Sequence, residues 1–305
     1  ELYINGERKQ MEHTWRTTPT RTAIQAEKGK SYNIEVRFQF VKTWNANLKI
    51  NVAKEQPIDY QQTIAQLKGI DKVIFVGGIS PALEGEEMPV NIEGFKGGDR
   101  TSIELPKVQR EFLKALKAAG KQVIFVNCSG SAIALTSETE SCDAIVQAWY
   151  PGQEGGTAVA DVLFGDVNPS GKLSVTFYKD DSQLPDYEDY SMKGRTYRYF
   201  NDALFPFGYG LSYTTFEIGE AQIKGENGNF EVSVPVANKG QRSGTEIVQL
   251  YIRDLSDKEG PLKSLRGFQR IDVQAGATAT ATIKLDKKSF EFWDAATNTM
   301  RTKPG

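Results

Sequence analysis

The hydrophobic and polar positions of this chain change their rhythm twice. From residue 1 to about 53, hydrophobic and polar residues alternate in short runs, which indicates β-strands. From about 57 to 178, compact hydrophobic runs alternate with segments of helical spacing, and from about 211 to 305 the period of two returns. The pattern predicts an all-β piece, an α/β unit and a second all-β unit, with a long connection over 179–210.

The first segment resembles one side of an antiparallel sandwich. Residues 2–4 lead into the turn Asn5-Gly6, which is a strong hairpin signal. Runs of period two over 32–40 and 47–52 predict further strands. These strands are too few for a complete sandwich, so we expect a partial domain.

The middle segment alternates between strand and helix signals. The expected strands cover 73–76, 122–127 and 144–149, and the expected helices cover 60–67, 105–119 and 155–164. Gly120 should end the second helix, because glycine readily adopts the left-handed conformation found after many helices. Such alternation predicts a mostly parallel sheet covered by helices, whose strand-end loops gather at one edge.

The last segment is all β. Alternation over 230–236, 246–252 and 278–285, separated by turns near 238–240 and 274–276, predicts a sandwich of immunoglobulin or fibronectin type III kind.

One loop of the α/β unit concentrates acidic residues. Glu84, Glu86 and Glu87 follow the predicted strand that ends in Gly77-Gly78. Open α/β sheets bind ligands at the carboxyl ends of their strands. Closely spaced carboxylates raise one another's pKa, which suits a general acid at neutral pH. A solvated acidic loop is the plainer alternative.

Composition excludes several classes of function. A net charge of −2 without a basic stripe argues against a nucleic-acid partner, and no apolar run approaches the length of a membrane span. The single histidine, His13, cannot build a zinc site or a serine triad, and no metal or organic cofactor is implied. Cys128 and Cys142 lack metal-site spacing, and two reduced, buried thiols are favoured over a single bridge.

An ordered set of motifs resembles the C-terminal part of a family 3 glycoside hydrolase. The motifs are Gly98-Asp99-Arg100, residues 127–131, residues 149–156, residues 162–173 and residues 205–213. Residues 1–53 resemble the tail of the sandwich of protective-antigen type that some members carry as an insertion. The resemblance implies an α/β sandwich domain over 54–178, a linker over 179–210 and a fibronectin type III-like domain over 211–305.

The resemblance implies a retaining exo-β-glycosidase that releases terminal xylose or glucose from plant-type oligosaccharides, with β-xylosidase favoured. The family's nucleophile is an Asp on an N-terminal (β/α)8 barrel, which needs roughly 200 residues or more, whereas the α/β unit here has roughly 120. The chain starts in strand rhythm and without Met, so we expect a piece of a longer enzyme that is inactive without its barrel. A secreted or periplasmic location follows from the resemblance alone.

The resemblance also assigns the acidic loop. Glu86 aligns with the family's acid/base, with Glu87 as second choice and Glu84 as third. For Asp99-Arg100, an internal ion pair that pins the loop over 79–104 is favoured over sugar binding. For Glu154, a position at a helix N-terminus is favoured over a place in the cleft.

Several aromatic residues have open assignments. Trp149 and Tyr150 fit either sugar stacking or core packing, and core filling is favoured for Trp15 and Trp44. Residues 195–200 are expected to pack against the barrel. The residues expected to pack the linker on the last sandwich are Phe205, Phe207, Tyr209 and Tyr213.

Two other classes of function remain as alternatives. A non-catalytic carbohydrate-binding or adhesion module would bind glycans alone and be indifferent to Glu86. A nucleotide-binding α/β protein is disfavoured, because the Gly-x-Gly-x-x-Gly fingerprint does not follow the first strand of the unit.

Overall fold

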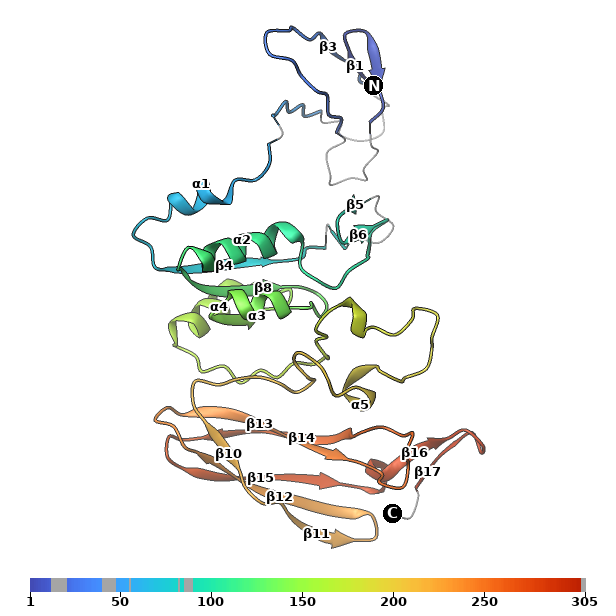
Figure 1. The fold of residues 1–305 in the computed structure, drawn as a ribbon. Coiled ribbons are helices and arrows are strands. Elements are labelled where there is room, and N and C mark those ends of the chain that lie inside the picture. Colours follow the sequence, from blue (N-terminus) through green and yellow to red (C-terminus); the bar gives the residue numbers. More distant parts are fainter. Residues whose placement is uncertain (12–20, 40–47, 55, 82, 85–89, 303–305) are drawn as a thin grey trace.

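The structure is a computed structural model that describes residues 1–11, 21–39, 48–54, 56–81, 83–84 and 90–302. Figure 1 shows the elements in three tiers that follow the sequence, with the N-terminal strands at one end and the C-terminal sandwich at the other. The α/β elements and the connection lie between them.

The N-terminal tier is a small antiparallel sheet in the order β2-β1-β3. Its strands are β1 (Leu2–Ile4), β2 (Glu7–Lys9) and β3 (Ile34–Val36). Asn5 and Gly6 both have positive φ, of 52° and 81°, so the predicted hairpin turn is confirmed.

Two strand predictions in this tier are wrong in extent. Over 32–39 only β3 forms, and residues 48–52 form no strand. Leu48, Ile50 and Val52 are 48%, 56% and 79% exposed, so no neighbouring strand or core covers their hydrophobic side chains. Period-two alternation becomes a strand only where a partner supplies the ladder hydrogen bonds and buries one face.

The α/β tier contains a parallel sheet in the order β4-β8-β9, as predicted. Its strands are β4 (Lys72–Gly78), β8 (Gln122–Cys128) and β9 (Ala144–Gln147). Its helices are α1 (Tyr60–Ala65), α2 (Lys107–Ala118), α3 (Thr136–Ser141) and α4 (Gly155–Phe164). Between β4 and α2 lies a second small sheet that the pattern did not reveal, of β5 (Asn91–Ile92), β6 (Phe95–Lys96) and β7 (Asp99–Arg100).

Helix α2 packs on β8 and on α3 through the core of this tier. Leu113 and Leu116 are fully buried, while Val108 is 44% exposed, so the two leucines mark the face of the helix that enters the core. Gly120 follows the helix with φ of 75°, which confirms the predicted stop. Burial of leucine side chains of this size contributes roughly 2 kcal/mol each.

The sheet is not covered on both faces at its β4 edge. Val73 and Phe75 point into the core, whereas Ile74 and Val76 are 47% and 65% exposed. Parallel sheets are usually buried on both faces, so this edge of the described structure carries an uncovered hydrophobic surface.

The connection contains η1 (Asp181–Gln183) and α5 (Thr196–Tyr199). The prediction that its aromatic residues all pack on the C-terminal sandwich is wrong for Phe205, which joins the α/β core and pairs with Phe177 through the backbone. Tyr209 stacks on Phe205, with ring centroids 5.1 Å apart. Conversely, Tyr197, expected to face the barrel, stacks on Phe207 and accepts a hydrogen bond from the Leu265 amide of the sandwich.

The C-terminal tier is a two-sheet sandwich. One sheet contains β10 (Phe216–Ile218), β11 (Gln222–Glu226), β12 (Asn229–Asn238) and β15 (Thr278–Leu285), and the other pairs β13 (Gly244–Ile252) with β14 (Ser264–Val273). After η2 (Lys287–Phe290), β16 (Glu291–Asp294) and β17 (Thr299–Thr302) form a hairpin. Val236, Val248 and Val273 are buried between the two sheets, so both contribute to one core.

The α/β tier and the sandwich are joined by polar side chains from the segment after α4. Lys172 forms an ion pair with Glu246 on β13 at 2.8 Å, and these side chains are only 17% and 12% exposed. Asn168 accepts hydrogen bonds from the Ser212 hydroxyl at 2.9 Å and the Tyr213 amide at 2.7 Å. The motif over 162–173 therefore builds the junction between two tiers.

Both cysteines are free thiols, and each is half-buried rather than buried as predicted. Burial raises the pKa of Cys142 to about 12. Within the described ranges, no helix combines the length and apolar character needed to cross a membrane.

Candidate functional site

The carboxyl ends of the three parallel strands meet at one edge, as the sequence predicts. Gly78 pairs with Cys128, and Asn127 pairs with Gln147, so β4, β8 and β9 end level with one another. The Asn127 amide is fully buried and donates to Gln147 Oε1 at 2.6 Å. Gln147 in turn donates to the Ser129 hydroxyl at 3.1 Å, so side-chain hydrogen bonds fix this edge beyond the ladder itself.

The acidic loop leaves this edge from a tightly fixed point. Gly78 has φ of +123°, and a Cβ there would lie 1.9 Å from the carbonyl oxygen of Cys128, so only glycine fits. The Gln109 side chain donates to the Gly78 carbonyl at 2.6 Å and accepts from the Gly78 amide at 2.8 Å. The start of the loop is thus tied to both β8 and α2.

The return of the loop is also fixed. Val90 and Phe95 are buried in the core cluster of the α/β tier. Strands β5, β6 and β7 pair in that order, with Phe95 on β6 and Arg100 on β7. Residues 90–104 of this loop are therefore folded and have their own hydrophobic anchors.

A cluster of four side chains ties the two ends of the loop together. We call Glu84, Arg100, Ser131 and Tyr150 the Arg100 cluster. Arg100 Nη1 donates to Ser131 Oγ at 2.9 Å, and Ser131 Oγ donates to Glu84 Oε1 at 3.2 Å. Tyr150 donates its hydroxyl to Glu84 Oε2 at 2.9 Å, and Arg100 Nη1 lies 3.8 Å from Glu84 Oε1.

The electrostatics of the cluster follow from its burial. The side chains of Arg100 and Glu84 are 14% and 21% exposed. Burial lowers the pKa of Arg100 even though the nearby Glu84 carboxylate raises it. Burial and the hydrogen bond to Glu84 raise the pKa of Tyr150 to about 12, so the phenol stays a donor through the neutral range.

Glu86 and Glu87, the first and second choices for the acid/base, lie outside the described residues, as do Trp15 and Trp44. Glu84, the third choice, is described, and both of its carboxylate oxygens accept hydrogen bonds. The predicted ion pair that pins the loop is present, and Arg100 makes it with Glu84.

The other predicted site residues have structural contacts. Trp149 lies against Phe177 with ring centroids 6.0 Å apart and joins the core cluster, so core packing holds for it. Glu154 occupies the N-cap position of α4, where its side chain accepts from the Thr157 hydroxyl at 3.3 Å. Asp99 is exposed on β7.

Sequence reasoning missed the link from Tyr150 and Ser131 to Glu84. Their positions in the sequence could have indicated this contact. Ser131 and Tyr150 follow two strands whose carboxyl ends were expected to lie at the same edge of the sheet. A Cβ on Gly130 would lie 2.6 Å from the Tyr150 ring, so the glycine between Ser129 and Ser131 admits this aromatic side chain.

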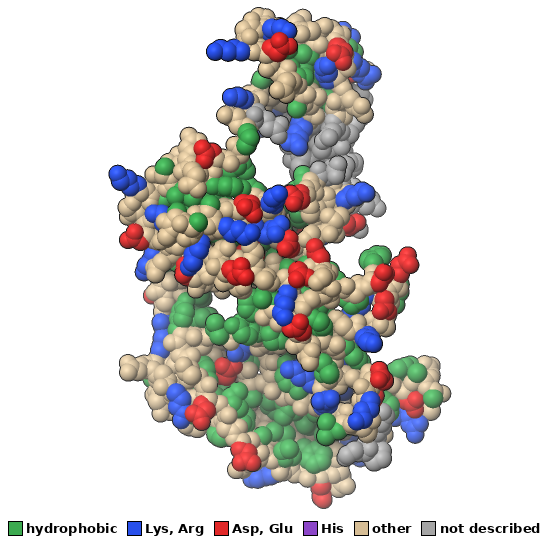
Figure 2. Space-filling view, in the orientation of Figure 1, with side chains coloured by type: hydrophobic (Ala, Val, Ile, Leu, Met, Phe, Trp, Pro, Cys, Tyr) green, Lys and Arg blue, Asp and Glu red, His purple; other side chains and the backbone are tan. Residues whose placement is uncertain are grey.

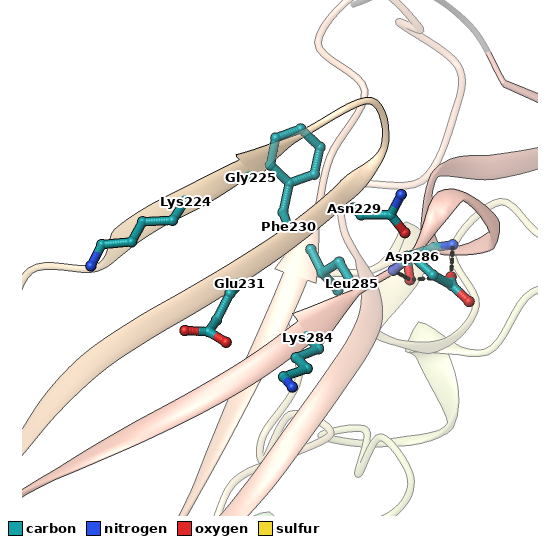
Figure 3. Close-up of a pocket in the computed structure, with 9 residues that line it drawn as sticks. Lys224, Gly225, Asn229, Phe230, Glu231, Lys284, Leu285 and Asp286 are labelled. Atoms are coloured by element: carbon teal, nitrogen blue, oxygen red, sulfur yellow. Dashed lines mark hydrogen bonds between the residues drawn. The ribbon is translucent and has the colours of Figure 1, made fainter.

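A separate cavity of about 750 Å³ lies on the C-terminal sandwich. Figure 3 shows Lys224, Glu231 and Lys284 on its neighbouring strands, and the register places Glu231 between the two lysines. This cavity contains none of the predicted site residues. Among the described residues, no group of three or more His, Cys, Asp and Glu side chains is arranged to hold a metal ion.

Comparison with known proteins places the chain in a family. The profile of the glycosyl hydrolase family 3 C-terminal domain matches residues 3–213, and that of the fibronectin type III-like domain matches residues 246–305. A xylan 1,4-beta-xylosidase of Xylanibacter ruminicola is 76% identical over all of this chain and 36% of the relative. A periplasmic beta-glucosidase of Salmonella typhimurium is 35% identical over 84% of this chain and 34% of that protein.

Solved structures agree with these matches. The beta-glucosidase D2-BGL from Chaetomella raphigera superposes with a TM-score of 0.70 at 30% identity, over 80% of this chain and 38% of that one. A beta-glucosidase from Listeria innocua in complex with isofagomine has a TM-score of 0.66 at 29% identity, over 81% of this chain and 35% of that one. The chain thus spans about a third of the length of the relatives it matches. This chain belongs to glycoside hydrolase family 3 and corresponds to the C-terminal part of its members.

Proposed function

We propose that this chain is the C-terminal portion of a retaining exo-β-glycosidase that releases terminal β-linked xylose from plant-type oligosaccharides, with Glu86 as its general acid/base. Its partner is the N-terminal (β/α)8 barrel portion of the same enzyme, which supplies the nucleophile. The whole enzyme is expected in the periplasm or outside the cell, in line with the periplasmic relative.

The observation that carries this proposal is the fixed loop at the carboxyl edge of the parallel sheet. Residue Glu84 is held by the Arg100 cluster and Val90 is buried, so the sequence bearing Glu86 runs between two anchored positions. A proton donor must lie within hydrogen-bond reach of the glycosidic oxygen. The anchors at Glu84 and Val90 both belong to the α/β tier and support a donor in the sequence between them.

The contacts of Glu84 support the choice among the three glutamates. Both of its oxygens accept hydrogen bonds, and Arg100 lies beside it, so Glu84 is engaged by contacts within the fold. A general acid instead must be free to contact the glycosidic oxygen. Glu86 and Glu87 remain, and the Gly85-Glu86 order resembles the family motif, which favours Glu86.

The proposed chemistry has two steps. Glu86 first protonates the departing glycosidic oxygen while the barrel carboxylate attacks the anomeric carbon and forms a glycosyl-enzyme. Glu86 then removes a proton from the water that releases the sugar. This mechanism requires the two carboxyl groups to lie about 5–5.5 Å apart across the interface between barrel and loop.

The names of two relatives favour xylose over glucose as the sugar that is released. The protein that is 76% identical over the whole chain is named a xylan 1,4-beta-xylosidase, and a beta-xylosidase of Formosa agariphila is 38% identical over 83% of the chain. Two beta-glucosidases match at 35% and 36% identity over 84% and 72% of the chain.

Azide rescue in the complete enzyme tests the assignment. In Glu86→Gln, hydrolysis of substrates with poor leaving groups should fall by about 10²–10⁴-fold, because protonation of the leaving group is lost. Azide, which needs no general base, should restore part of the rate on 2,4-dinitrophenyl β-xyloside and yield β-xylosyl azide.

Glu87→Gln is the matched control for this experiment, because it removes a neighbouring carboxylate of the same loop. It should retain most of its activity on poor leaving groups. Full activity of Glu86→Gln together with the loss and azide rescue in Glu87→Gln would transfer the role to Glu87.

A further inference from the structure

Strand β4 is an edge strand of the parallel sheet. It pairs with β8 on one side, and its other edge has no strand partner among the described residues. Figure 1 shows it on the side of the sheet toward the N-terminal tier. Edge strands are normally protected by charges, prolines or bulges, or they are covered by another segment. β4 contains no proline, and Lys72 at its start is its only charged residue, so its protection must come from a cover.

The two faces of β4 differ in burial. Val73 and Phe75 pack on the core of the α/β tier, whereas Ile74 and Val76 on the opposite face are 47% and 65% exposed. Exposure on this second face falls sharply toward the middle of the sheet, because Val126, which pairs with Val76, is only 1% exposed. The described fold therefore covers the second face over β8 and leaves it bare over β4.

The sequence of β4 is typical of a strand that is buried on both faces. Residues 73–76 are four consecutive hydrophobic residues, as are residues 123–126 of the central strand β8. Strands with one solvated face usually alternate between hydrophobic and polar residues, whereas strands of parallel sheets that are covered on both faces carry continuous hydrophobic runs. We therefore expect a segment outside the described structure to lie over Ile74 and Val76.

The part of the enzyme that precedes residue 1 fits this surface best. The chain corresponds to the C-terminal part of family members and spans 36% of the relative that is 76% identical to it, so the greater part of the enzyme lies N-terminal to it. A segment of the same polypeptide reaches β4 at a much higher effective concentration than a second copy of the chain does.

We propose that a segment from before residue 1 packs over Ile74 and Val76 and continues the sheet beyond the free edge of β4. In the complete enzyme β4 is then an interior strand, and the α/β tier is built from sequence on both sides of the small sheet of β1, β2 and β3. This inference rests on family membership, and it holds whichever glutamate is the general acid/base.

Thiol labelling of the complete enzyme tests whether the face is covered. Val76→Cys should react with iodoacetamide about 100-fold or more slowly than Ile223→Cys, because a covered thiol reacts only when the structure opens locally. Ile223 is the matched control, since it is a hydrophobic residue of the edge strand β11 and is 66% exposed. Similar labelling rates at the two positions would overturn the proposal.

Photo-crosslinking identifies what covers the face. Lys72, Ile74 and Val76 alternate along β4 and so lie on one face, and Lys72 is exposed. A diazirine analogue of lysine at position 72 of the complete enzyme should cross-link to a peptide from before residue 1, as read by digestion and mass spectrometry. Cross-links only to peptides of residues 1–305, from the same or a second copy, or reaction with water alone, would overturn the proposed occupant.

Hydrogen exchange of the complete enzyme tests the pairing at the edge. Strand β8 is paired on both sides, whereas β11 pairs on one side with β12. The amides of β4 should exchange as slowly as those of β8, since every one of them is then hydrogen-bonded or covered. Exchange as fast as that of β11 would show that β4 remains an edge strand. None of these outcomes depends on Glu86, so the proposed function stands or fails separately.

Discussion

At the scale of single residues, one half-buried and one fully buried carboxylate of the α/β tier have opposite surroundings. Glu84 is held by a hydroxyl, a phenol and a guanidinium, whereas Glu138 on α3 is fully buried and no other described residue hydrogen-bonds to either of its oxygens. Burial raises the pKa of Glu138 to about 7. The sequence predicted a carboxylate site after β4, and it carried no sign that a glutamate of α3 would be enclosed.

The buried Glu138 should make the chain less stable as pH rises. In the unfolded chain this group loses its proton near pH 4.5, and in the folded chain near pH 7, so unfolding releases a proton between these values. The free energy of unfolding should therefore fall by about 3 kcal/mol from pH 4.5 to pH 8, from this residue alone. Below pH 4.5 the contribution is fully present and constant.

Urea unfolding of the chain and of Glu138→Gln, compared at pH 5 and pH 8, isolates this contribution from that of other carboxylates. The variant should be more stable than wild type at pH 8, and its advantage should shrink at pH 5. An advantage that is equal at both pH values would show that Glu138 is ionised in the fold throughout.

Part of the candidate site could be predicted from the sequence, and the contact partner of Arg100 could not. The spacing of acids after Gly77-Gly78 located the loop, and the motif Gly98-Asp99-Arg100 suggested an ion pair. The partner, Glu84, was not readable, because the contact depends on Ser131 and Tyr150 from two other strand ends. Such long-range polar contacts can be predicted only when the register of the sheet is known. The spacing of hydrophobic residues along the chain does not determine that register.

At the scale of elements, strands and helices were predictable where tertiary contacts agree with the local pattern. The strands over 73–76 and 122–127 formed as expected, because the core of the α/β tier covers at least one of their faces. The helix over 155–164 also formed as expected, although none of its residues is fully buried. Residues 48–52 alternate between hydrophobic and polar side chains in the same way. They have no strand partner among the described residues, so they form no strand. β5, β6 and β7 were missed, because strands of two residues carry no period to detect.

The junction between α4 and the sandwich should be sensitive to Asn168. Its Oδ1 accepts from Ser212 and Tyr213, and its Nδ2 donates to the Ser243 carbonyl at 3.1 Å. Asn168→Ala removes these three hydrogen bonds, of which the one from Ser212 is partly buried, and should lower the free energy of unfolding by roughly 1–3 kcal/mol.

Urea denaturation measures this loss, with Asn201→Ala as control, because Asn201 is an exposed asparagine of the connection. The control should change stability by no more than about 0.5 kcal/mol. Equal effects of the two substitutions would mean that Asn168 does not hold the junction.

At the scale of the whole molecule, the chain presents uncovered hydrophobic surface. Tyr187 and Tyr190 are each 92% exposed on the loop that projects beside α5, where Figure 2 shows hydrophobic and acidic side chains together. This loop is ordered by Arg195, which donates to the carbonyls of Asp186 at 3.2 Å and Ser191 at 3.1 Å. An ordered loop with two exposed tyrosines suits contact with another protein surface.

In the complete enzyme these tyrosines should be covered by the N-terminal portion. Hydroxyl-radical footprinting of the complete enzyme and of the isolated chain should show oxidation of Tyr187 and Tyr190 in the chain and strong protection in the enzyme. Tyr3, which lies in the N-terminal sheet beneath Arg37, serves as an internal reference. Protection that appears only after xylo-oligosaccharide is added would assign the surface to substrate instead.

The division of the chain into domains at 53, 178 and 210 stays a prediction from the resemblance. The family, the parallel sheet and the fibronectin type III-like sandwich are shown by the comparisons and the structure together. The sequence predicted this architecture because each tier has its own hydrophobic period. It could not predict how the tiers join, since the junction consists of single polar contacts such as that of Lys172 with Glu246.

We propose that this chain supplies the proton donor while the nucleophile lies elsewhere in the enzyme. The glycosyl-enzyme can be trapped with a 2-deoxy-2-fluoro-β-xylosyl fluoride and identified by digestion and mass spectrometry, because the fluorosugar marks the attacking carboxylate. We expect a single labelled Asp in a peptide N-terminal to residue 1, and every peptide of residues 1–305 should be unmodified. A fluorosugar bound to any carboxylate within residues 1–305 would contradict it.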